Sequence, residues 1–378
     1  MQFLVASDSF KDALTAYKAC VAIEKGIRHV YPHAEVIKKP MADGGEGTLD
    51  VIATFENTES LVVHTVDPLG RPIRATYFIL NQKEAFIELA RASGLELLLA
   101  SERNPLLTST FGTGKLMSDA FEKGIRKFTL AIGGSATNDM GSGLLQAIGF
   151  RFFDKKHQEL SPNGGNLNRI VRIDDSAVHP DWYLCEFNIA CDVNNPLLGE
   201  NGATHTYGKQ KGASPSALKK LERNLAHFAE VLQTINSKLD VQQPGFGAAG
   251  GVAVGLSTFF KVQLQSGFAC LANWVDLESA IRKADYVFTG EGSIDAQTLA
   301  GKTPFGVAQM AKKHNKPVIC LCGRKGKGYQ KLYNHGVTAV FSILDEVTSL
   351  DKALLRTEEL IEDTTINVLR LLTLNTFR

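Results

Sequence analysis

The chain has 378 residues, which exceeds the size of most single hydrophobic cores, so two domains are the leading expectation. An apolar content of 44% and a charged content of 21% are those of an ordinary globular protein. The 41 Lys and Arg residues nearly balance the 40 Asp and Glu residues, which excludes a general bias toward nucleic acid or a membrane surface. Any affinity for an anionic ligand must therefore come from locally placed cations and backbone amides.

The N-terminal segment and the cysteine pattern favour a cytoplasmic protein. Residues 1–10 carry neither a basic leader nor a small-residue cleavage signal, and no apolar run approaches the roughly 18 residues of a membrane span. The six cysteines form no CxxC pair and the nine histidines are scattered. We therefore expect reduced thiols and no metal held by His or Cys, while a hard cation on carboxylates stays open.

Strand and helix signals alternate at both ends of the chain. Strands are expected at residues 2–6, 34–39, 285–290, 317–323 and 337–344. Helical periodicity follows the first strand and begins again after Thr303. A closing amphipathic helix is expected to carry Leu354, Ile361, Val368 and Leu372 on one face. This alternation predicts a doubly wound, Rossmann-like parallel sheet with crossover helices.

The middle of the chain has a different pattern of strand and helix signals. Residues 74–80 and 84–89 are strand-like runs with no room for a helix between them, which predicts antiparallel pairing. Helices near 109–123 and 215–237 and strands at 127–132 and 186–191 are also expected. Neither terminal part has enough strands for a stable sheet by itself. We therefore expect a discontinuous Rossmann-like α/β domain, residues 1–66 and 284–378, with a second α/β domain inserted over residues 67–283.

Two polar loops follow the expected strands of the N-terminal part. Asp8 could hold a metal or a hydroxyl and Lys11 could neutralise phosphate, although Asp and Ser in such a loop can also merely cap a helix. Residues 41–48 combine Asp43 and Glu46 with three glycines. The glycines would let backbone amides approach an anion while the carboxylates hold Mg²⁺ or a substrate hydroxyl. The alternative is a tight turn before a helix.

The segment at residues 131–143 is the most informative one. An apolar strand ends there in two glycines followed by hydroxyl, amide and carboxylate side chains: Gly133, Gly134, Ser135, Thr137, Asn138 and Asp139. Phosphoryl transfer needs little covalent chemistry but many donors placed around phosphate. A structural turn needs only one or two glycines, so this density of polar groups favours a functional loop.

Three further polar or glycine-rich segments lie in the middle region. Asp192 directly follows a strand and is a candidate metal ligand or base, in a polar loop that also holds Lys209 and Lys211 and could equally be exposed surface. Residues 108–117 offer hydroxyls at a helix start, which suits an anion or ordinary capping. Residues 244–255 contain GxGxxG without a preceding apolar strand, so we reject a dinucleotide fingerprint and expect close backbone approach instead.

The last acidic loop begins where the strand at 285–290 ends. Glu291 and Asp295 are four positions apart, so on one helical turn they would face the same way. Gly301, Lys302 and Thr303 resemble the end of a phosphate-binding loop, but the first glycine of that motif is replaced by Ala296. Acids beside such a helix start favour the rim of an active site.

Taken together, these motifs closely resemble the bacterial glycerate kinase family of the two-domain α/β type, which makes 2-phosphoglycerate. The resemblance rests on long motifs in the same order, among them SDSFKDALTA, MADGGEGT, AIGGSATNDMGSG, CDVNNPLLG, GFGAAGG and TGEGSIDAQTLAGKTP. It covers effectively the whole chain. It implies ATP as donor, Mg²⁺ as cofactor, D-glycerate as acceptor, and two α/β domains with the active site in the cleft between them.

The resemblance and the loop chemistry lead to an expected set of site residues. The catalytic residues are Lys11 on the transferring phosphate, with Asp192 and Asp295 as base or metal ligand. Substrate and phosphate are expected at Asp8, Ser9, Gly44, Gly45, Gly133, Gly134, Ser135, Thr137, Asn138, Lys209, Lys211, Gly292 and Ser293. The metal is expected at Asp43, Glu46, Asp139 and Glu291.

Other functions stay open beside glycerate 2-kinase. A glycerate 3-kinase would act on the same substrate at the other hydroxyl group. A nicotinamide-dependent dehydrogenase would explain the sheet, but the dinucleotide fingerprint fails. A periplasmic-type binding protein would need an export signal and would leave the loop acids without purpose. The expected partners are D-glycerate and ATP, with no nucleic acid and no membrane, and the sequence leaves the oligomeric state open.

Overall fold

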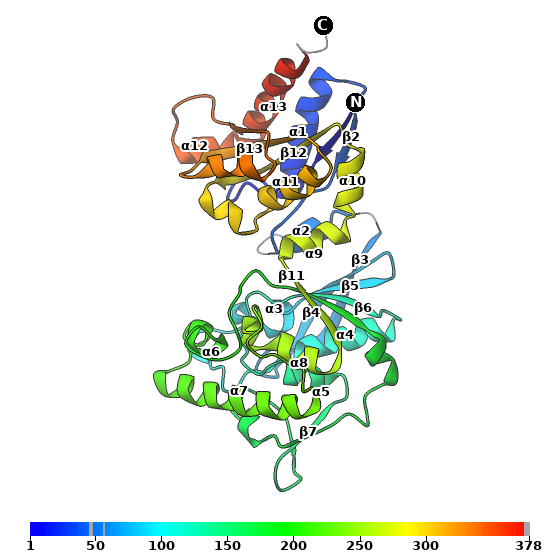
Figure 1. Cartoon of the computed structure of the whole chain (residues 1–378), viewed down its shortest axis with the longest axis vertical. Coiled ribbons are helices and arrows are strands. Elements are labelled where there is room, and N and C mark those ends of the chain that lie inside the picture. The colour runs from blue at the N-terminus through cyan, green and yellow to red at the C-terminus, as the bar shows by residue number, and fades with distance from the viewer. Residues whose placement is uncertain (45–47, 56, 374–378) are drawn as a thin grey trace. The chain divides into compact units, whose positions relative to one another are not determined.

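A computed structural model describes residues 1–44, 48–55 and 57–373. The chain divides into two compact units, unit 1 with residues 1–56 and 266–378 and unit 2 with residues 57–265 (Figure 1). These boundaries differ from the expected ones for a physical reason. Residues 58–66 form a strand that pairs inside unit 2, whereas residues 267–283 form two helices that pack within unit 1.

Unit 1 is built on a five-stranded sheet in which every neighbouring pair is parallel. Its strands, in spatial order, are β2 (Glu35–Lys38), β1 (Gln2–Val5), β12 (Tyr286–Ile294), β13 (Val318–Lys325) and β14 (Ala339–Ser342). Phe3, Leu4 and Val5 are all fully buried, because a parallel sheet is covered on both faces. The predicted doubly wound parallel sheet is confirmed.

The helices of unit 1 cover this sheet. They are α1 (Ala16–Val30), α2 (Thr48–Ile52), α9 (Gly267–Trp274), α10 (Leu277–Lys283), α11 (Thr303–Lys313), α12 (Leu350–Leu355) and α13 (Thr357–Thr373). Helices α1 and α13 lie side by side (Figure 1) and share a core with Phe3 and Val5, while α10 contacts β1 and α11 contacts β12. The expected single closing helix is two helices, because the backbone at Arg356 leaves helical geometry with ψ of 5°. Leu354 therefore lies in α12, apart from the apolar face of α13.

Unit 2 contains a six-stranded mixed sheet. Its strands, in spatial order, are β11 (Lys261–Gln265), β10 (Glu186–Ala190), β6 (Lys127–Ala131), β5 (Glu84–Glu88), β4 (Pro72–Leu80) and β3 (Thr58–Val66). The pairs from β11 to β5 are parallel, and β4 pairs antiparallel with both β5 and β3. The predicted antiparallel pairing at β4 and β5 is confirmed. A small antiparallel sheet adds β7 (Arg151–Phe153), β8 (Glu159–Leu160) and β9 (Arg172–Asp174).

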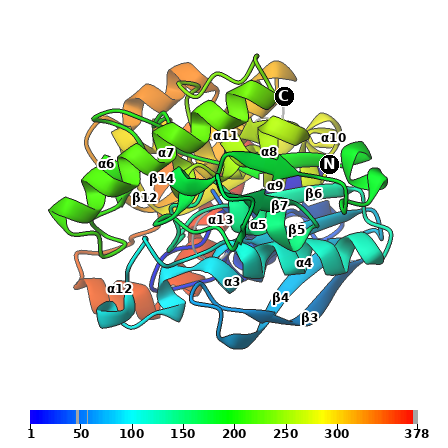
Figure 2. The ribbon, with the colours of Figure 1, turned by 90° about the horizontal axis from the view of Figure 1, so that it is seen from below.

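The helices of unit 2 connect and cover these strands. They are α3 (Ala90–Ser93), α4 (Phe111–Glu122), α5 (Ser142–Ala147), α6 (Ala203–Tyr207), α7 (Pro215–Ile235) and α8 (Val252–Phe259). Helix α4 packs across β3, β4 and β5 (Figure 2), and α8 packs on β11. The six cysteines of the chain are free thiols, as expected. No helix in the described part of the chain is long and apolar enough to cross a membrane.

Parallel strands bring their carboxyl ends to one edge of a sheet, and each unit has such an edge. In unit 1 the chain runs from β1 outward to β2 and from β12 outward to β13 and β14, so β1 and β12 flank the topological switch point. Open α/β sheets bind their ligands at that position. In unit 2 the corresponding edge is formed by β5, β6 and β10.

Candidate active site

Asp8 lies at the switch point of unit 1, shortly after β1 ends. Its Oδ2 accepts a hydrogen bond from the Thr303 hydroxyl at 2.5 Å, and its Oδ1 accepts one from the Ser9 amide at 2.7 Å. Burial raises the pKa of the Asp8 carboxyl to about 6, and the carboxylates of Asp43 and Glu291 act in the same direction. A carboxyl group that titrates near neutral pH is suited to accept a proton in general base catalysis.

Glu291 is a second carboxylate of this strand edge. Its Oε2 accepts a hydrogen bond from Nζ of Lys302 at 3.0 Å, and its Oε1 accepts one from the Thr298 hydroxyl at 2.8 Å. Burial raises the pKa of the Glu291 carboxyl, and the Lys302 ammonium opposes that effect. The expectation that Glu291 and Asp295 share one helical turn is wrong. Pairing with β13 continues β12 as far as Ile294, and Asp295 then begins a 3₁₀ turn.

Lys11 lies in a tight turn that Phe10 and Leu14 close by a β-bridge. Its side chain is exposed. A side-chain carbon at Gly292 would lie 3.4 Å from the backbone nitrogen of Lys11, so the turn rests against β12. The structure thus brings the predicted residues Lys11 and Gly292 together, at the edge that also holds Asp8.

The predicted acidic loop at residues 41–48 is described only in part. Asp43 is half-buried and lies close enough to Asp8 to raise the pKa of that carboxyl. Gly44 has a φ of +94°, which a glycine adopts without strain. Gly45 and Glu46 lie outside the described residues, and their predicted roles stay predictions.

The Mg²⁺ that the family resemblance implies would need carboxylate ligands at this edge. In the described ranges, no group of three or more His, Cys, Asp and Glu side chains is arranged to hold a metal ion. Mg²⁺ is usually held by only one or two carboxylates together with substrate phosphates, so the half-buried Asp43 fits such a site. Glu291 fits less well, because both of its carboxylate oxygens accept hydrogen bonds from the protein.

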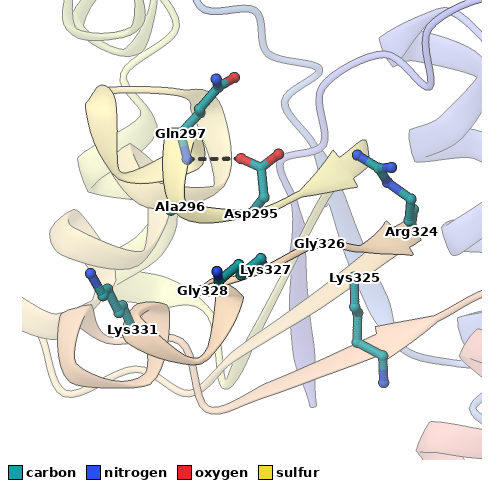
Figure 3. Close-up of a pocket in the computed structure, with 9 residues that line it drawn as sticks. All are labelled: Asp295, Ala296, Gln297, Arg324, Lys325, Gly326, Lys327, Gly328 and Lys331. Carbon is teal, nitrogen blue, oxygen red and sulfur yellow. Dashed lines mark hydrogen bonds between the residues drawn. The ribbon is translucent and has the colours of Figure 1, made fainter.

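A basic pocket lies beside these groups, at the carboxyl ends of β12 and β13 (Figure 3). It has a volume of about 700 Å³ and is lined by Asp295, Ala296, Gln297, Arg324, Lys325, Gly326, Lys327, Gly328 and Lys331. The predicted residue Asp295 is on its wall and accepts a hydrogen bond from the Gln297 amide at 2.8 Å. Ser293 accepts one from Nε of Arg324 at 3.3 Å. Sequence reasoning missed this pocket, although the run of Arg, Lys and Gly at residues 323–328 was a visible signal.

Gly133 and Gly134 follow β6 at the carboxyl edge of unit 2. Both are exposed, and Gly133 has open space where a side chain would stand. A side chain at Gly134 would lie 3.4 Å from Cβ of Ala90, directly after β5. Asp192 follows β10, which pairs with β6, and its side chain is also exposed. The structure therefore places three predicted residues along one strand edge.

An ion pair at the same edge was not expected. Glu88 ends β5, the neighbour of β6, and its Oε2 accepts a hydrogen bond from Nε of Arg91 at 3.2 Å. Arg91 is exposed and follows Ala90, which lies near Gly134. The signal available in the sequence was a Glu and an Arg that directly follow an apolar strand.

Asp139 lies in the interior of unit 2 rather than at the edge. It is fully buried, and its Oδ2 accepts hydrogen bonds from both the amide and the hydroxyl of Thr110, each at 2.8 Å. The amides of Gly141 and Gly143 donate two more, each longer than 3 Å. Burial raises the pKa of the Asp139 carboxyl, and these donors lower it. The anion at the start of α4 is thus the protein's own Asp139, which does not fit the metal ligand that we expected.

Lys211 is buried, whereas Lys209, two residues earlier, is exposed. Nζ of Lys211 donates hydrogen bonds to Oγ of Ser135 at 2.8 Å and to the carbonyl of Thr137 at 2.6 Å. Burial lowers the pKa of the Lys211 ammonium to about 7, and the charge of Asp139 opposes that effect. Lys211 therefore ties the loop at residues 208–212 to the glycine-rich loop instead of pointing to solvent.

The close backbone approach expected for residues 244–255 is confirmed, and the partner is the loop after β6. Gly250 has a φ of +69°, and its carbonyl accepts a hydrogen bond from the Met140 amide at 2.9 Å. A side chain at Gly250 would lie 2.5 Å from Cα of Asn138. Asn138 is fully buried and donates from Nδ2 to the hydroxyl of Thr204 at 3.3 Å.

The two strand edges define the class of protein: an α/β enzyme with cations, glycines and a near-neutral carboxyl group at the carboxyl ends of parallel strands. The glycerate kinase family model matches residues 3–373. The chain is 43% identical to a glycerate kinase of Halalkalibacterium halodurans over 97% of this chain and 96% of the relative. It is 42% identical to the glycerate 2-kinase of Escherichia coli over 93% of each chain.

A solved structure is similar as well. The crystal structure of a candidate glycerate kinase 2 from Salmonella typhimurium LT2 superposes with a TM-score of 0.89 at 37% sequence identity, covering 100% of both chains. The chain belongs to the glycerate kinase family, and it is a kinase.

Proposed function

We propose that the protein transfers the γ-phosphoryl group of ATP to the C2 hydroxyl of D-glycerate and releases ADP and 2-phosphoglycerate. The observation that carries the proposal is the identity of 42% to a glycerate 2-kinase over 93% of both chains. Glycerate 3-kinase activity is the alternative on the same substrate. We also propose that the protein works in the cytoplasm, where ATP is available.

The edge of unit 1 is proposed to serve the phosphoryl group. Asp8 takes the proton of the attacking hydroxyl, since its pKa of about 6 leaves it ionised at neutral pH yet still basic. Lys11 neutralises oxygens of the transferring group. Asp43 is the proposed carboxylate ligand of Mg²⁺, which neutralises charge on the phosphates when bound. Glu291 positions Lys302 through their ion pair at 3.0 Å instead of holding the metal.

The edge of unit 2 is proposed to bind the acceptor. The amides of Gly133 and Gly134 and the guanidinium of Arg91 are donors for the carboxylate of glycerate. Asp192 is exposed and serves as an acceptor for a hydroxyl group of glycerate. Ser135, Thr137, Asn138, Asp139 and Lys211 are buried, so we assign them the role of holding this loop in shape.

A coupled assay of ADP release with D-glycerate, L-glycerate and glycerol tests the reaction. We expect turnover with D-glycerate alone, and its loss in EDTA because the phosphates would lack Mg²⁺. Full turnover in EDTA would contradict the metal role. Phosphorus NMR of the product separates the two hydroxyl positions, and a signal of 3-phosphoglycerate alone would contradict the C2 assignment while leaving the kinase activity intact.

A further inference from the structure

The basic pocket of unit 1 has four cationic side chains and one carboxylate in its lining. Arg324, Lys325, Lys327 and Lys331 line it together with a single carboxylate, that of Asp295. Lys325 directly follows Arg324 in β13, and its side chain points away from Asp295 (Figure 3). The whole chain has a formal net charge of only +1. Cations that line one pocket repel each other, which is unfavourable for folding. Such clusters also raise the local concentration of anions.

These cations are not neutralised inside the protein. Across the described part of the chain, none of the four forms an ion pair with a carboxylate, whereas Lys302 on the neighbouring segment pairs with Glu291. Arg324 bonds a hydroxyl, and Lys325 lies 5.8 Å from the centre of the Tyr329 ring. All four side chains are exposed, so their charge is available to a ligand.

The backbone of the loop at residues 323–328 is held against the segment that carries Asp295. The Gly326 amide donates to the Ile294 carbonyl at 2.6 Å, and the Ala296 amide donates to the Lys327 carbonyl at 3.1 Å. A side chain at Gly326 would lie 2.7 Å from Cβ of Asp295, so only glycine allows this approach. Backbone hydrogen bonds therefore fix the position of the loop that carries Arg324, Lys325 and Lys327.

Size and charge identify the ligand class. A volume of about 700 Å³ is within the range of sites that enclose a molecule of nucleotide size. Glycerate is much smaller and carries one carboxylate, which one or two donors satisfy. The three remaining cations of the lining, Arg324, Lys327 and Lys331, match a polyphosphate chain, which carries several negative charges.

We propose that the basic pocket, lined by Arg324, Lys325, Lys327 and Lys331 beside Asp295, binds the phosphate chain of the donor nucleotide. The proposal rests on the proposed function and extends it by assigning the donor to a place. Asp295 follows the strand that carries Glu291, so the pocket adjoins the edge with Asp8 and Lys302. Asp295 was expected as base or metal ligand. In this proposal it lies beside the phosphate chain of the nucleotide, and it is not the base.

Two variants and a matched control test the pocket. Lys327→Met and Lys331→Met each remove one exposed charge with little change in shape, and Lys313→Met removes an exposed charge on α11 away from the pocket. Isothermal titration with inorganic tripolyphosphate and with ATP gives the affinities. We expect about tenfold weaker binding of both in the pocket variants. The KM for ATP should rise while the KM for D-glycerate and the melting temperature stay unchanged.

The possible outcomes distinguish a wrong pocket assignment from a wrong proposed function. Wild-type affinity and wild-type KM for ATP in both pocket variants, with normal ADP release from D-glycerate, would overturn the pocket assignment and leave the kinase intact. Binding of tripolyphosphate that weakens only in the pocket variants, in a protein that does not turn over D-glycerate, would support the pocket and contradict the proposed function. Equal weakening in Lys313→Met would show a general charge effect and would overturn the assignment.

Discussion

Replacing the buried Lys211 by Met should change how the stability of the protein depends on pH. Methionine keeps the length and most of the volume of the side chain but removes the ammonium group. The substitution leaves Oγ of Ser135 and the carbonyl of Thr137 without the donor, which costs roughly 1–3 kcal/mol for each buried acceptor. It also removes a charge whose burial is unfavourable. The net effect at one pH is therefore ambiguous, whereas the slope against pH isolates the charge.

The magnitude follows from the lowered pKa. In the unfolded chain a lysine titrates near 10.4, so it stays protonated from pH 7 to pH 9. In the folded protein the pKa of Lys211 is about 7, so the side chain is half deprotonated at pH 7 and almost fully deprotonated at pH 9. The unfolded state then binds more protons, and the free energy of unfolding rises with pH. Relative to Lys211→Met, the wild type should gain about 2 kcal/mol between pH 7 and pH 9.

Urea unfolding at pH 7, 8 and 9 measures this gain. Titration of groups that do not interact with Lys211 is common to both proteins and largely cancels in the difference. Lys209→Met is the matched control, because Lys209 is exposed in the same loop and should follow the wild type. Parallel curves for wild type and Lys211→Met across this range would refute the buried charge and the anchoring role built on it.

Three further predictions concern the strand edge of unit 1 and the loop packing of unit 2. Lys11→Met should lower kcat at least about 100-fold with an unchanged melting temperature, because an exposed cation contributes to charge stabilisation and little to packing. Unchanged turnover would mean that Lys11 is only part of the turn and has no catalytic role. Activity should fall as the pH drops through about 6, the pKa of Asp8. Thr303→Val should shift this acidic limb of the pH–activity profile to higher pH, because the Thr303 hydroxyl lowers the pKa of Asp8. A limb that moves to lower pH would contradict this. Gly250→Ala should destabilise the protein by about 2–4 kcal/mol in thermal unfolding, whereas Gly199→Ala, which has a positive φ of +97° but open space, should cost about 1 kcal/mol. Equal losses would mean that the close contact is unimportant.

Local patterns were enough to predict much of the fold. Apolar runs at residues 2–6 and 34–39 are β1 and β2, and the short gap between β4 and β5 correctly predicted an antiparallel pair. These features are readable because strand length, turn length and burial on both faces leave a signal in consecutive residues. Loops with acids and glycines after strands likewise pointed to the strand edges.

The sequence by itself determined which loops are rich in site chemistry, and its long motifs identified the family. Tertiary structure alone decided which polar side chains of those loops reach the edge. Gly133 is exposed, whereas Asp139, six residues on, is fully buried and bound by Thr110. Lys209 and Lys211 differ in the same way. Partners distant in the chain set this burial, so local composition cannot predict it, and the length of β12 depended likewise on its pairing with β13.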